Sequence, residues 1–334
     1  MSKIVSIGGG TGLSTLLSGI KRYVEPAEIV TDLTVSSLTA IVTVTDDGGS
    51  SGRIREEFNI LPPGDIRNCL VALSEDEKLL AKLFQYRFAG NGGLNGHSFG
   101  NLFLTALTGV TGDFLEAIKL SSEVLAVRGR IFPSTMTDVT LHAELTNGQI
   151  VHGESNITAS QVGISKVWLS PKRCLPLQEA LDAIREADLI TLGPGSLYTS
   201  VIPNLLVEGI AKAIAESAAT KVYVANIMTQ PGETIGYDLT KHLAAIFDAA
   251  PELTIDIVVV NNRPISEAQQ KLYAADGAYQ IGLQEANHGL LQVNSRSIRL
   301  VADDLLDCCD KVRHSPQKLA QLLIKILAER GIKI

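Results

Sequence analysis

The sequence of 334 residues predicts an α/β protein with a Rossmann-like, doubly wound and mostly parallel sheet that carries an antiparallel β-hairpin excursion. Three observations predict this class. Apolar runs of strand length recur along the chain, each ends in a loop of glycine or polar residues, and a helical pattern follows. Strands that alternate with helices in this way are typical of a parallel sheet with helices on both faces.

The first unit is an apolar strand over residues 3–7, a turn with the sequence Gly-Gly-Gly-Thr-Gly, and a helical pattern of leucines. Glycines let the backbone approach a ligand closely, and the N–H groups that open the helix point at an anion. The spacing departs from the dinucleotide fingerprint, because Leu13 stands where the third glycine belongs, and no Lys-Ser or Lys-Thr follows as in a P-loop. A plain tight turn is the alternative to a phosphate-binding loop. The residues of the predicted phosphate loop are Gly9, Gly10, Thr11 and Gly12.

Four later runs are apolar and β-branched, as expected of strands that are buried on both faces. They cover residues 38–44, 188–192, 221–226 and 255–261. The second of these runs ends in Gly-Pro-Gly-Ser and is followed by a helical pattern over residues 204–217. The repetition of strand, loop and helix predicts a parallel sheet.

Residues 131–170 break this rhythm, because apolar and polar residues alternate on both sides of an Asn-Gly hairpin signal at 147–148. We interpret this segment as a β insertion within a single domain that spans residues 1–334. An amphipathic helix is expected over residues 315–330, with Ser315 as its N-cap and Gly331 as its stop signal.

Composition and charge restrict the function classes. The formal net charge of −7 and the lack of a long basic run argue against a surface that coats nucleic acid, whereas a local site for a small anion fits. Four cysteines without C-x-x-C spacing predict reduced thiols, and the first residues do not resemble a signal peptide, so we expect a cytoplasmic protein. No apolar run reaches the roughly 18 residues that a membrane span needs.

Ligands of a parallel sheet bind beyond the carboxyl ends of the strands, so the loops that follow the strands form one candidate site. Asp46 and Asp47 follow the second strand and could serve a ribose hydroxyl, orient a nucleophile or hold a divalent cation; a turn or helix cap is the alternative. Ser196 lacks a G-x-S-x-G context and an assignable base, so we expect it to contact phosphate. The candidates in the later loops are Gly193, Gly195, Ser196, Asn226 and Asn261.

Two predicted helices begin at glycine-containing segments, residues 63–68 and 96–102, and both segments add polar candidates for the site. Asp65 can cap the first helix, and Arg67 in its first turn opposes the helix dipole, which favours a role in binding a carboxylate or phosphate together with Asn68. A surface ion pair is the alternative for Arg67. At the second start, His97 and Asn101 lie four residues apart, and His97 either donates to an oxyanion or phosphate or is structural.

Five sequence blocks in this order resemble the CofD-like family, whose better-defined members are 2-phospho-L-lactate transferases. The resemblance extends over about residues 3–315 and is strongest to the gluconeogenesis-factor branch. The blocks are residues 8–12, 45–53, 63–68, 96–102 and 192–200.

The resemblance implies a Rossmann-like fold in a cytoplasmic bacterial protein. The transferases move a phospholactyl group from a nucleotide-activated donor with magnesium. The gluconeogenesis-factor branch is instead associated with cell shape, with growth on gluconeogenic carbon sources and with binding of UDP-sugars such as UDP-N-acetylglucosamine. Carried onto this chain, the phosphates would lie against residues 9–12 and 193–196, with Asp46 and Asp47 as metal or acceptor ligands. Tyr273 and Arg313 match, by motif context, a tyrosine and an arginine implicated in UDP-sugar binding.

The favoured hypothesis is a nucleotide-sugar-binding regulatory protein to which no reaction is assigned. A magnesium-dependent transferase of the 2-phospho-L-lactate type competes with it, although an aromatic content of 5% argues against a deazaflavin acceptor. An NAD-linked oxidoreductase ranks last, because Asp32, about 20 positions beyond the glycines, precedes the second strand and does not end it. The expected partners are the nucleotide-sugar or a dinucleotide, a second copy of the chain in a homo-oligomer, and proteins of cell-wall synthesis.

Overall fold

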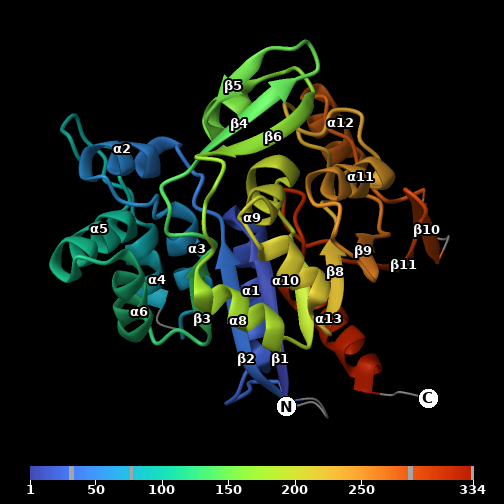
Figure 1. Ribbon diagram of the computed structural model, residues 1–334, viewed down its shortest axis with the longest axis horizontal. Helices are drawn as coiled ribbons and strands as arrows, with labels where there is room; N and C mark the ends of the chain where they lie inside the picture. Colours follow the sequence, from blue (N-terminus) through green and yellow to red (C-terminus); the bar gives the residue numbers. More distant parts are fainter. Residues whose placement is uncertain (30–33, 76–77, 285–288, 332–334) are drawn as a thin grey trace.

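The main sheet is mixed and mostly parallel (Figure 1). The computed structural model describes residues 1–29, 34–75, 78–284 and 289–331, and within these ranges eight strands form the sheet in the order β10-β11-β9-β8-β7-β1-β2-β3. All neighbours pair in parallel except β10 with β11. The strands are β1 Ser2–Gly8, β2 Val35–Val42, β3 Arg130–Pro133, β7 Leu189–Leu192, β8 Thr220–Val224, β9 Ile257–Asn261, β10 Leu290–Val293 and β11 Arg296–Asp303.

The order of the parallel strands confirms the predicted doubly wound fold. The chain moves outward from β1 through β2 to β3, then returns to the other side of β1 with β7 and continues through β8 to β9. The direction of winding therefore reverses between β1 and β7. Such a reversal leaves a crevice beyond the carboxyl ends of the two central strands, because the loops that follow them depart in opposite directions.

Helices cover both faces of this sheet (Figure 1). Helix α1 packs against α3 and α13, whereas α8 packs against α10 on the opposite face. The helices are α1 Gly10–Ile20, α2 Gly49–Phe58, α3 Gly64–Leu73, α4 Lys78–Gln85, α5 Phe99–Thr111, α6 Phe114–Val124, α7 Glu154–Ala159, α8 Gln178–Glu186, α9 Ile202–Leu205, α10 Ile210–Glu216, α11 Leu239–Ala249, α12 Glu267–Ala275 and α13 Pro316–Gly331.

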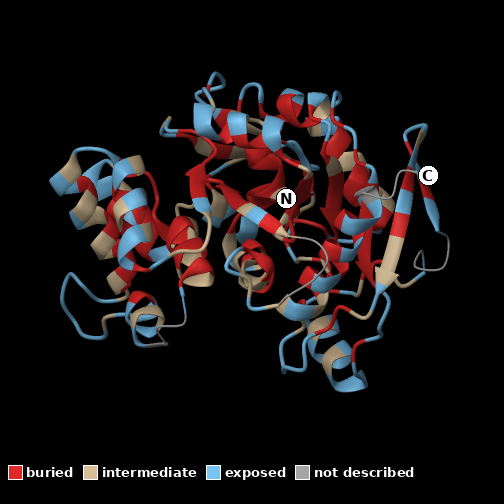
Figure 2. Cartoon of the chain, turned by 90° about the horizontal axis from the view of Figure 1, so that it is seen from below, coloured by how far each residue is buried: buried red, intermediate tan, exposed pale blue. Residues whose placement is uncertain are grey.

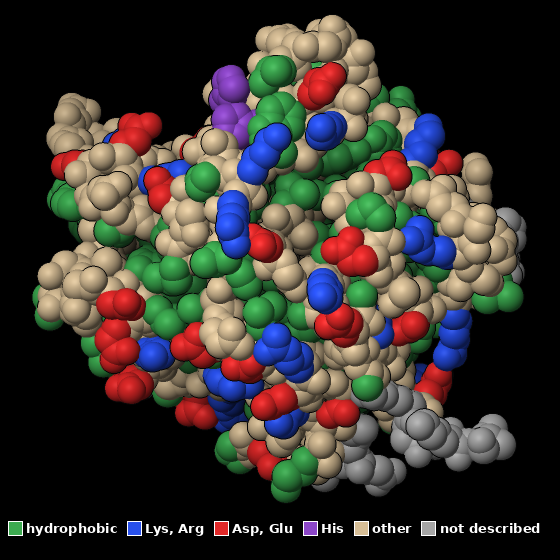
Figure 3. All heavy atoms as spheres, in the orientation of Figure 1, with side chains coloured by type: hydrophobic (Ala, Val, Ile, Leu, Met, Phe, Trp, Pro, Cys, Tyr) green, Lys and Arg blue, Asp and Glu red, His purple; other side chains and the backbone are tan. Residues whose placement is uncertain are grey.

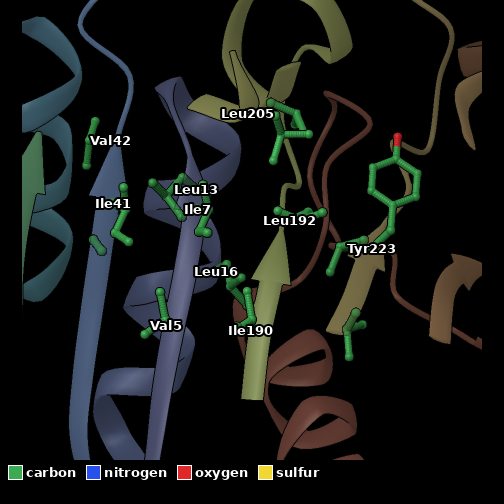
Figure 4. Packing of buried hydrophobic residues seen from close by; sticks show 14 of the residues in the cluster. Val5, Ile7, Leu13, Leu16, Ile41, Val42, Ile190, Leu192, Leu205 and Tyr223 are labelled. Atoms are coloured by element: carbon green, nitrogen blue, oxygen red, sulfur yellow. The ribbon is translucent and has the colours of Figure 1, made fainter. Parts of the chain in front are cut away.

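The core lies between the central strands and these helices, where Figure 2 shows the buried residues concentrated. Val5 and Ile7 of β1 and Leu192 of β7 pack with Leu13 and Leu16 of α1 (Figure 4). Leu13 has no exposed surface, so the residue that replaces the third glycine of a dinucleotide fingerprint is a core residue. The departure from that fingerprint thus has a packing cause.

The expected helix over residues 204–217 is interrupted. A π-helical segment, Leu197–Val201, leads into the short α9, and α10 begins only at Ile210. Gly209 lies between them with φ of 85°, a left-handed conformation that glycine adopts without steric cost and that ends a continuous helix.

The insertion forms a second, antiparallel sheet with the order β5-β4-β6, as the alternation predicts. Its strands are β4 Thr140–Leu145, β5 Ile150–His152 and β6 Ile164–Ser170. The antiparallel part begins at Thr140, because residues 131–133 instead pair with β2 at the edge of the main sheet. The insertion lies beyond the carboxyl ends of the parallel strands (Figure 1), and histidine side chains gather on its surface (Figure 3), where His142 pairs with His152.

The C-terminal helix is α13, which begins one residue after Ser315, close to its expected bounds. It crosses α1 at short range, because a Cβ added to Gly19 would lie 2.1 Å from the carbonyl oxygen of Pro316 and 2.9 Å from the Cβ of Ala320. In the part of the chain that the structure describes, every helix is too short or too polar to traverse a bilayer.

The close crossing of α1 and α13 makes Gly19 a test of the packing. We expect Gly19→Ala to lower the free energy of unfolding by about 1 to 3 kcal/mol, because the added methyl group forces the two helices apart. Urea unfolding followed by circular dichroism measures this change. In the control Gly109→Ala, at an exposed position of α5, the new Cβ meets no atom within 4 Å. That control should gain stability through helix propensity, and equal effects of the two substitutions would contradict the close crossing.

Candidate functional site

A cavity of about 570 Å³ opens at the carboxyl ends of β1, β7 and β8, where the strand order reverses. Loops after β1, β2, β7 and β8 contribute to its wall, together with α7 of the insertion and two C-terminal segments. The residues in its wall that the sequence had suggested are Gly9, Gly10, Thr11, Gly12, Asp46, Gly195, Ser196, Asn226, Tyr273 and Arg313.

The first loop lines the cavity, and neighbouring atoms leave Gly9 and Gly12 no room for a side chain. A Cβ on Gly9 would lie 2.5 Å from Oδ2 of Asp65, and one on Gly12 would lie 2.3 Å from the carbonyl oxygen of Pro194. Gly10 opens α1 with φ of 61°. The first N–H groups of an α-helix have no intrahelical acceptor, so this helix start suits an anion.

The side-chain amides of Asn226 and Gln230 hold the second loop, residues 193–196, in place. Asn226 holds both backbone groups of Gly195: its Oδ1 accepts from the Gly195 N–H at 3.2 Å and its Nδ2 donates to the Gly195 carbonyl at 2.8 Å. The hydroxyl of Ser196 accepts from Nε2 of Gln230 at 2.7 Å. An amide is not a base, so this contact does not activate Ser196 as a nucleophile.

The buried side chain of Glu233 holds the π-helical segment that follows this loop. Glu233 accepts from the backbone N–H of Tyr198 and from the hydroxyl of Thr199, both at 3.2 Å. Burial raises the pKa of Glu233 to about 7, against the lowering effect of these hydrogen bonds. A single carboxyl group thus fixes the chain directly after the loop.

Four carboxyl groups of the described residues line the cavity. One is that of Asp276, and the other three, those of Asp46, Asp65 and Glu154, interact with one another electrostatically. Burial and the charge of Asp46 raise the pKa of Asp65 to about 7, although the Gly10 N–H donates to it. Burial and the charges of Asp65 and Asp46 raise the pKa of Glu154 to about 9, and its Oε2 has no hydrogen-bond partner. The three groups repel one another, so a bound cation or a shared proton would stabilise them.

The carboxyl groups fit magnesium only in part. Within the described ranges, no group of three or more His, Cys, Asp or Glu side chains is placed to hold a metal ion by itself. Magnesium in proteins commonly uses one or two carboxylates and takes its other ligands from water and substrate phosphates. Asp46 and Asp65 match that donor set when a phosphate is bound beside them.

A second cavity of about 290 Å³ shares Asp46 and Asp65 with the first. Arg67, Asn68 and Asn101 line it. The Arg67 side chain is buried, donates to Ser98 Oγ at 2.7 Å and to Asn68 Oδ1 at 2.6 Å, and its Nε has no partner. The alternative of a surface ion pair is therefore wrong for Arg67.

The wall of the main cavity also has an apolar part. Ile227 and Met228, which follow β8, form a small core with Ile265 and Leu306, and Tyr273 and Val312 pack against it. The hydroxyl of Tyr273 accepts from the backbone N–H of Val312 at 3.0 Å, which ties α12 to the segment that carries Arg313. The cavity thus runs from glycine loops and carboxyl groups at one end to apolar side chains at the other.

A family model described as 2-phospho-L-lactate transferase CofD matches residues 4–306. The chain belongs to the CofD family. It is 48% identical over 322 residues to a gluconeogenesis factor of Halalkalibacterium halodurans, covering 96% of this chain and 95% of that protein. It is 44% identical to the gluconeogenesis factor of Bacillus subtilis, with 98% of both chains covered.

A solved structure of a similar protein supports the fold. The crystal structure of a UPF0052 family member from Bacillus halodurans has a TM-score of 0.86 and 46% sequence identity to this chain, and the match covers 97% of this chain and 99% of that one. The resemblance expected from the five sequence blocks is confirmed at the level of family and fold.

Four residues suggested by the CofD-like blocks and loops lie outside both cavities. Asp47 accepts from the backbone N–H of Ser155 at 2.8 Å and so joins the loop after β2 to the insertion. His97 bonds to the hydroxyl of Ser50 at 3.0 Å, and Asn261 accepts from the Leu305 N–H at 3.0 Å. Gly193 supplies the left-handed turn after β7, with φ of 76°. Their observed contacts brace the walls of the cavities.

The sequence did not predict several residues of the main cavity wall. Asp65 was considered only as a helix cap, although it makes no side-chain cap and faces the cavity beside Asp46. No sequence motif marks Glu154 as a site residue, because it lies at the start of a short helix in the insertion. Gln230 and His314 also line the cavity. Asp32, the acid considered for a dinucleotide, lies outside the described residues.

The raised pKa of Glu233 predicts a pH-dependent stability. Between about pH 4.5 and 7 the unfolded chain loses this proton while the folded chain keeps it, so the free energy of unfolding falls as the pH rises. We expect Glu233→Gln to reduce that fall by on the order of 1 to 3 kcal/mol. Urea unfolding at pH 5 and at pH 8 measures it. Glu179→Gln, which alters an exposed acid on α8, is the matched control, and parallel slopes for all three proteins would contradict the prediction.

Proposed function

We propose that the main cavity binds a nucleotide-sugar of the UDP-N-acetylglucosamine type, and that the protein is a cytoplasmic regulator needed for cell shape during growth on gluconeogenic carbon sources. The observation that carries the proposal is the difference between the two ends of this cavity. Two backbone loops stand at one end, and apolar side chains with Tyr273 and Arg313 stand at the other.

The polar end suits a diphosphate. The start of α1 provides backbone N–H donors, and the first turn of this helix holds no acidic residue. The carboxyl groups beside them are close enough to take sugar hydroxyls or a phosphate-bound cation. A volume of about 570 Å³ lies within the usual range for small-molecule sites.

The regulator hypothesis also draws on the names of the relatives. The relatives described above are named gluconeogenesis factors, a name for a role in carbon metabolism that specifies no reaction. The hydrogen-bond partner of Ser196 is an amide and not a base, which favours binding over turnover. A regulator acts through partners, and proteins of cell-wall synthesis are the expected ones.

Titration calorimetry of the full chain with UDP-N-acetylglucosamine tests the proposal. We expect saturable binding by the wild type, and at least tenfold weaker binding by Arg313→Gln, because a charged hydrogen bond to the ligand is lost. NAD in the same experiment serves as the competing ligand, and the ligand recovered afterwards should be unchanged.

The matched control for Arg313 is Arg263→Gln. Arg263 is an exposed arginine that pairs with Asp304 at 3.2 Å and does not line the cavity. Its variant should bind as the wild type does. Binding of NAD without binding of the UDP-sugar, or an equal loss in both variants, would refute the proposal.

A magnesium-dependent transferase is the second candidate, and the pair of adjoining cavities favours it. A transferase needs a donor site and an acceptor site that meet at the reacting atoms, and the two cavities share Asp46 and Asp65. Magnesium held by these two carboxylates and by donor phosphates would stabilise the charge that develops on the leaving group. Arg67 and Asn101 would then contact the acceptor.

The Asp46→Asn variant distinguishes a magnesium-dependent transferase from a protein that only binds the nucleotide-sugar. Asp46 accepts from the Gly48 N–H at 2.9 Å, and the amide oxygen of the substituted side chain can accept the same bond, so the loop should keep its shape. If magnesium bridges Asp46 and the phosphates, the wild type should bind the UDP-sugar at least tenfold more tightly with magnesium than with EDTA, and the variant should lose this difference. Asp47→Asn is the control and should keep it. The same behaviour in both variants would argue against the metal.

A further inference from the structure

The nucleotide-sugar proposal leaves the second cavity, of about 290 Å³, without a ligand. Two arginines and two aspartates line this cavity, and the rest of its wall is glycine, serine and asparagine. Such a wall offers charges and hydrogen bonds but no apolar surface, so it suits a small polar ligand and not a nucleobase. Residues 48–51, which belong to one of the five sequence blocks and have no role so far, form part of this wall.

Arg67 and Arg87 bring two positive charges to the second cavity. Arg67 is 8% exposed, and its guanidinium group donates to Oγ of Ser98 and to Oδ1 of Asn68. Arg87 donates to the carbonyl oxygen of Gly96 at 3.0 Å. All of these acceptors are neutral, so the bonds orient the two guanidinium groups without balancing their charges.

The two cations lie close enough to affect each other. Burial and the charge of Arg87 lower the pKa of Arg67, against the raising effects of Asp65 and Asp46. Both aspartates also line the main cavity and so belong to the wall that the two cavities share, whereas the arginines line the second cavity alone. A buried guanidinium group held by neutral acceptors is costly, and a bound anion lowers that cost.

The start of α2 borders the same cavity and adds further donors. Gly48 is the N-cap of this ten-residue helix, which has no side-chain cap and no acidic residue in its first turn. A Cβ added to Gly49 would meet no atom within 4 Å, so the space beside this turn is open. The first N–H groups of a helix have no intrahelical acceptor and favour an anion. Two arginines and a helix start thus border one polar cavity.

We infer that the second cavity binds the phosphate group of a small phosphorylated molecule, separate from the ligand of the main cavity, between Arg67, Arg87 and the start of α2. A phosphate dianion accepts several hydrogen bonds at once and matches the planar guanidinium group. The inference goes beyond the proposed function, because it adds a second ligand, and it does not depend on which ligand fills the main cavity.

Inorganic phosphate is the probe, and NMR of the full chain with ¹⁵N-labelled arginine follows its binding. EDTA in the buffer prevents a cation at the shared carboxylates from mediating the binding. We expect the signals of Arg67 and Arg87 to shift in a saturable way with phosphate and not with chloride at equal ionic strength. Saturating UDP-N-acetylglucosamine should change the phosphate affinity by no more than about threefold, because the two ligands occupy different cavities.

Arg87→Gln removes one charge from an exposed side chain and keeps an N–H donor for the Gly96 carbonyl, so the fold should persist. Its phosphate affinity, followed at Arg67, should fall at least about tenfold. Arg53→Gln is the matched control. Arg53 is also exposed and holds the same loop by donating to the Asn95 carbonyl at 2.8 Å, but it does not line the cavity. This control should bind phosphate as the wild type does.

The outcomes separate this inference from the proposed function. Equal losses in Arg87→Gln and Arg53→Gln, shifts that do not saturate, or displacement of phosphate by UDP-N-acetylglucosamine would overturn the second ligand. Displacement would mean that the phosphates of one nucleotide reach both cavities. None of these results affects the calorimetric test of the nucleotide-sugar. Conversely, saturable phosphate binding that Arg87→Gln weakens would stand even if the nucleotide-sugar failed to bind.

Discussion

The whole site depends on the contact between the backbones of two loops. Where the winding reverses, the start of α1 meets the loop after β7 so closely that a Cβ on Gly12 would lie 2.3 Å from the Pro194 carbonyl oxygen. Only a residue without a side chain allows this approach. Because the two loops touch, the start of α1 and the loop after β7 border one cavity. The amides of Asn226 and the buried acid Glu233 then hold the second loop and the segment after it in place.

Electrostatic repulsion is the second feature of this arrangement. The folded chain brings Asp46, Asp65 and Glu154 to one cavity, and their mutual repulsion and burial raise the pKa of two of them. A fold that only had to be stable would place apolar or paired groups there. A ligand that brings both phosphates and a cation or hydroxyl donors would stabilise these carboxyl groups.

The sequence predicted the fold well because its signals were local. Apolar runs that end in glycine loops predict a parallel sheet directly, and the Asn-Gly signal located the hairpin of the insertion. The contributions of Asp65, Glu154 and His314 to the cavity were not predictable in this way. Each lies in a separate part of the chain, and each becomes a wall residue only through tertiary packing: Asp65 through its contact with Gly10, Glu154 through the placement of the insertion, and His314 through its β-bridge with Leu306.

The geometry of the cavity also restricts which nucleotides fit. A dinucleotide in a Rossmann fold spans both halves of the sheet, and its first half extends along β2. Here the apolar surface that could hold a base comes from the segment after β8 and from the C-terminal part of the chain, on the other side of β1. Beyond β2 lies the smaller cavity, which is lined by glycine, serine, arginine, asparagine and carboxyl groups and offers a base no apolar wall. One base and its phosphates therefore match the main cavity better than two linked nucleotides do, and the space beyond Asp46 and Asp65 suits a polar or charged group.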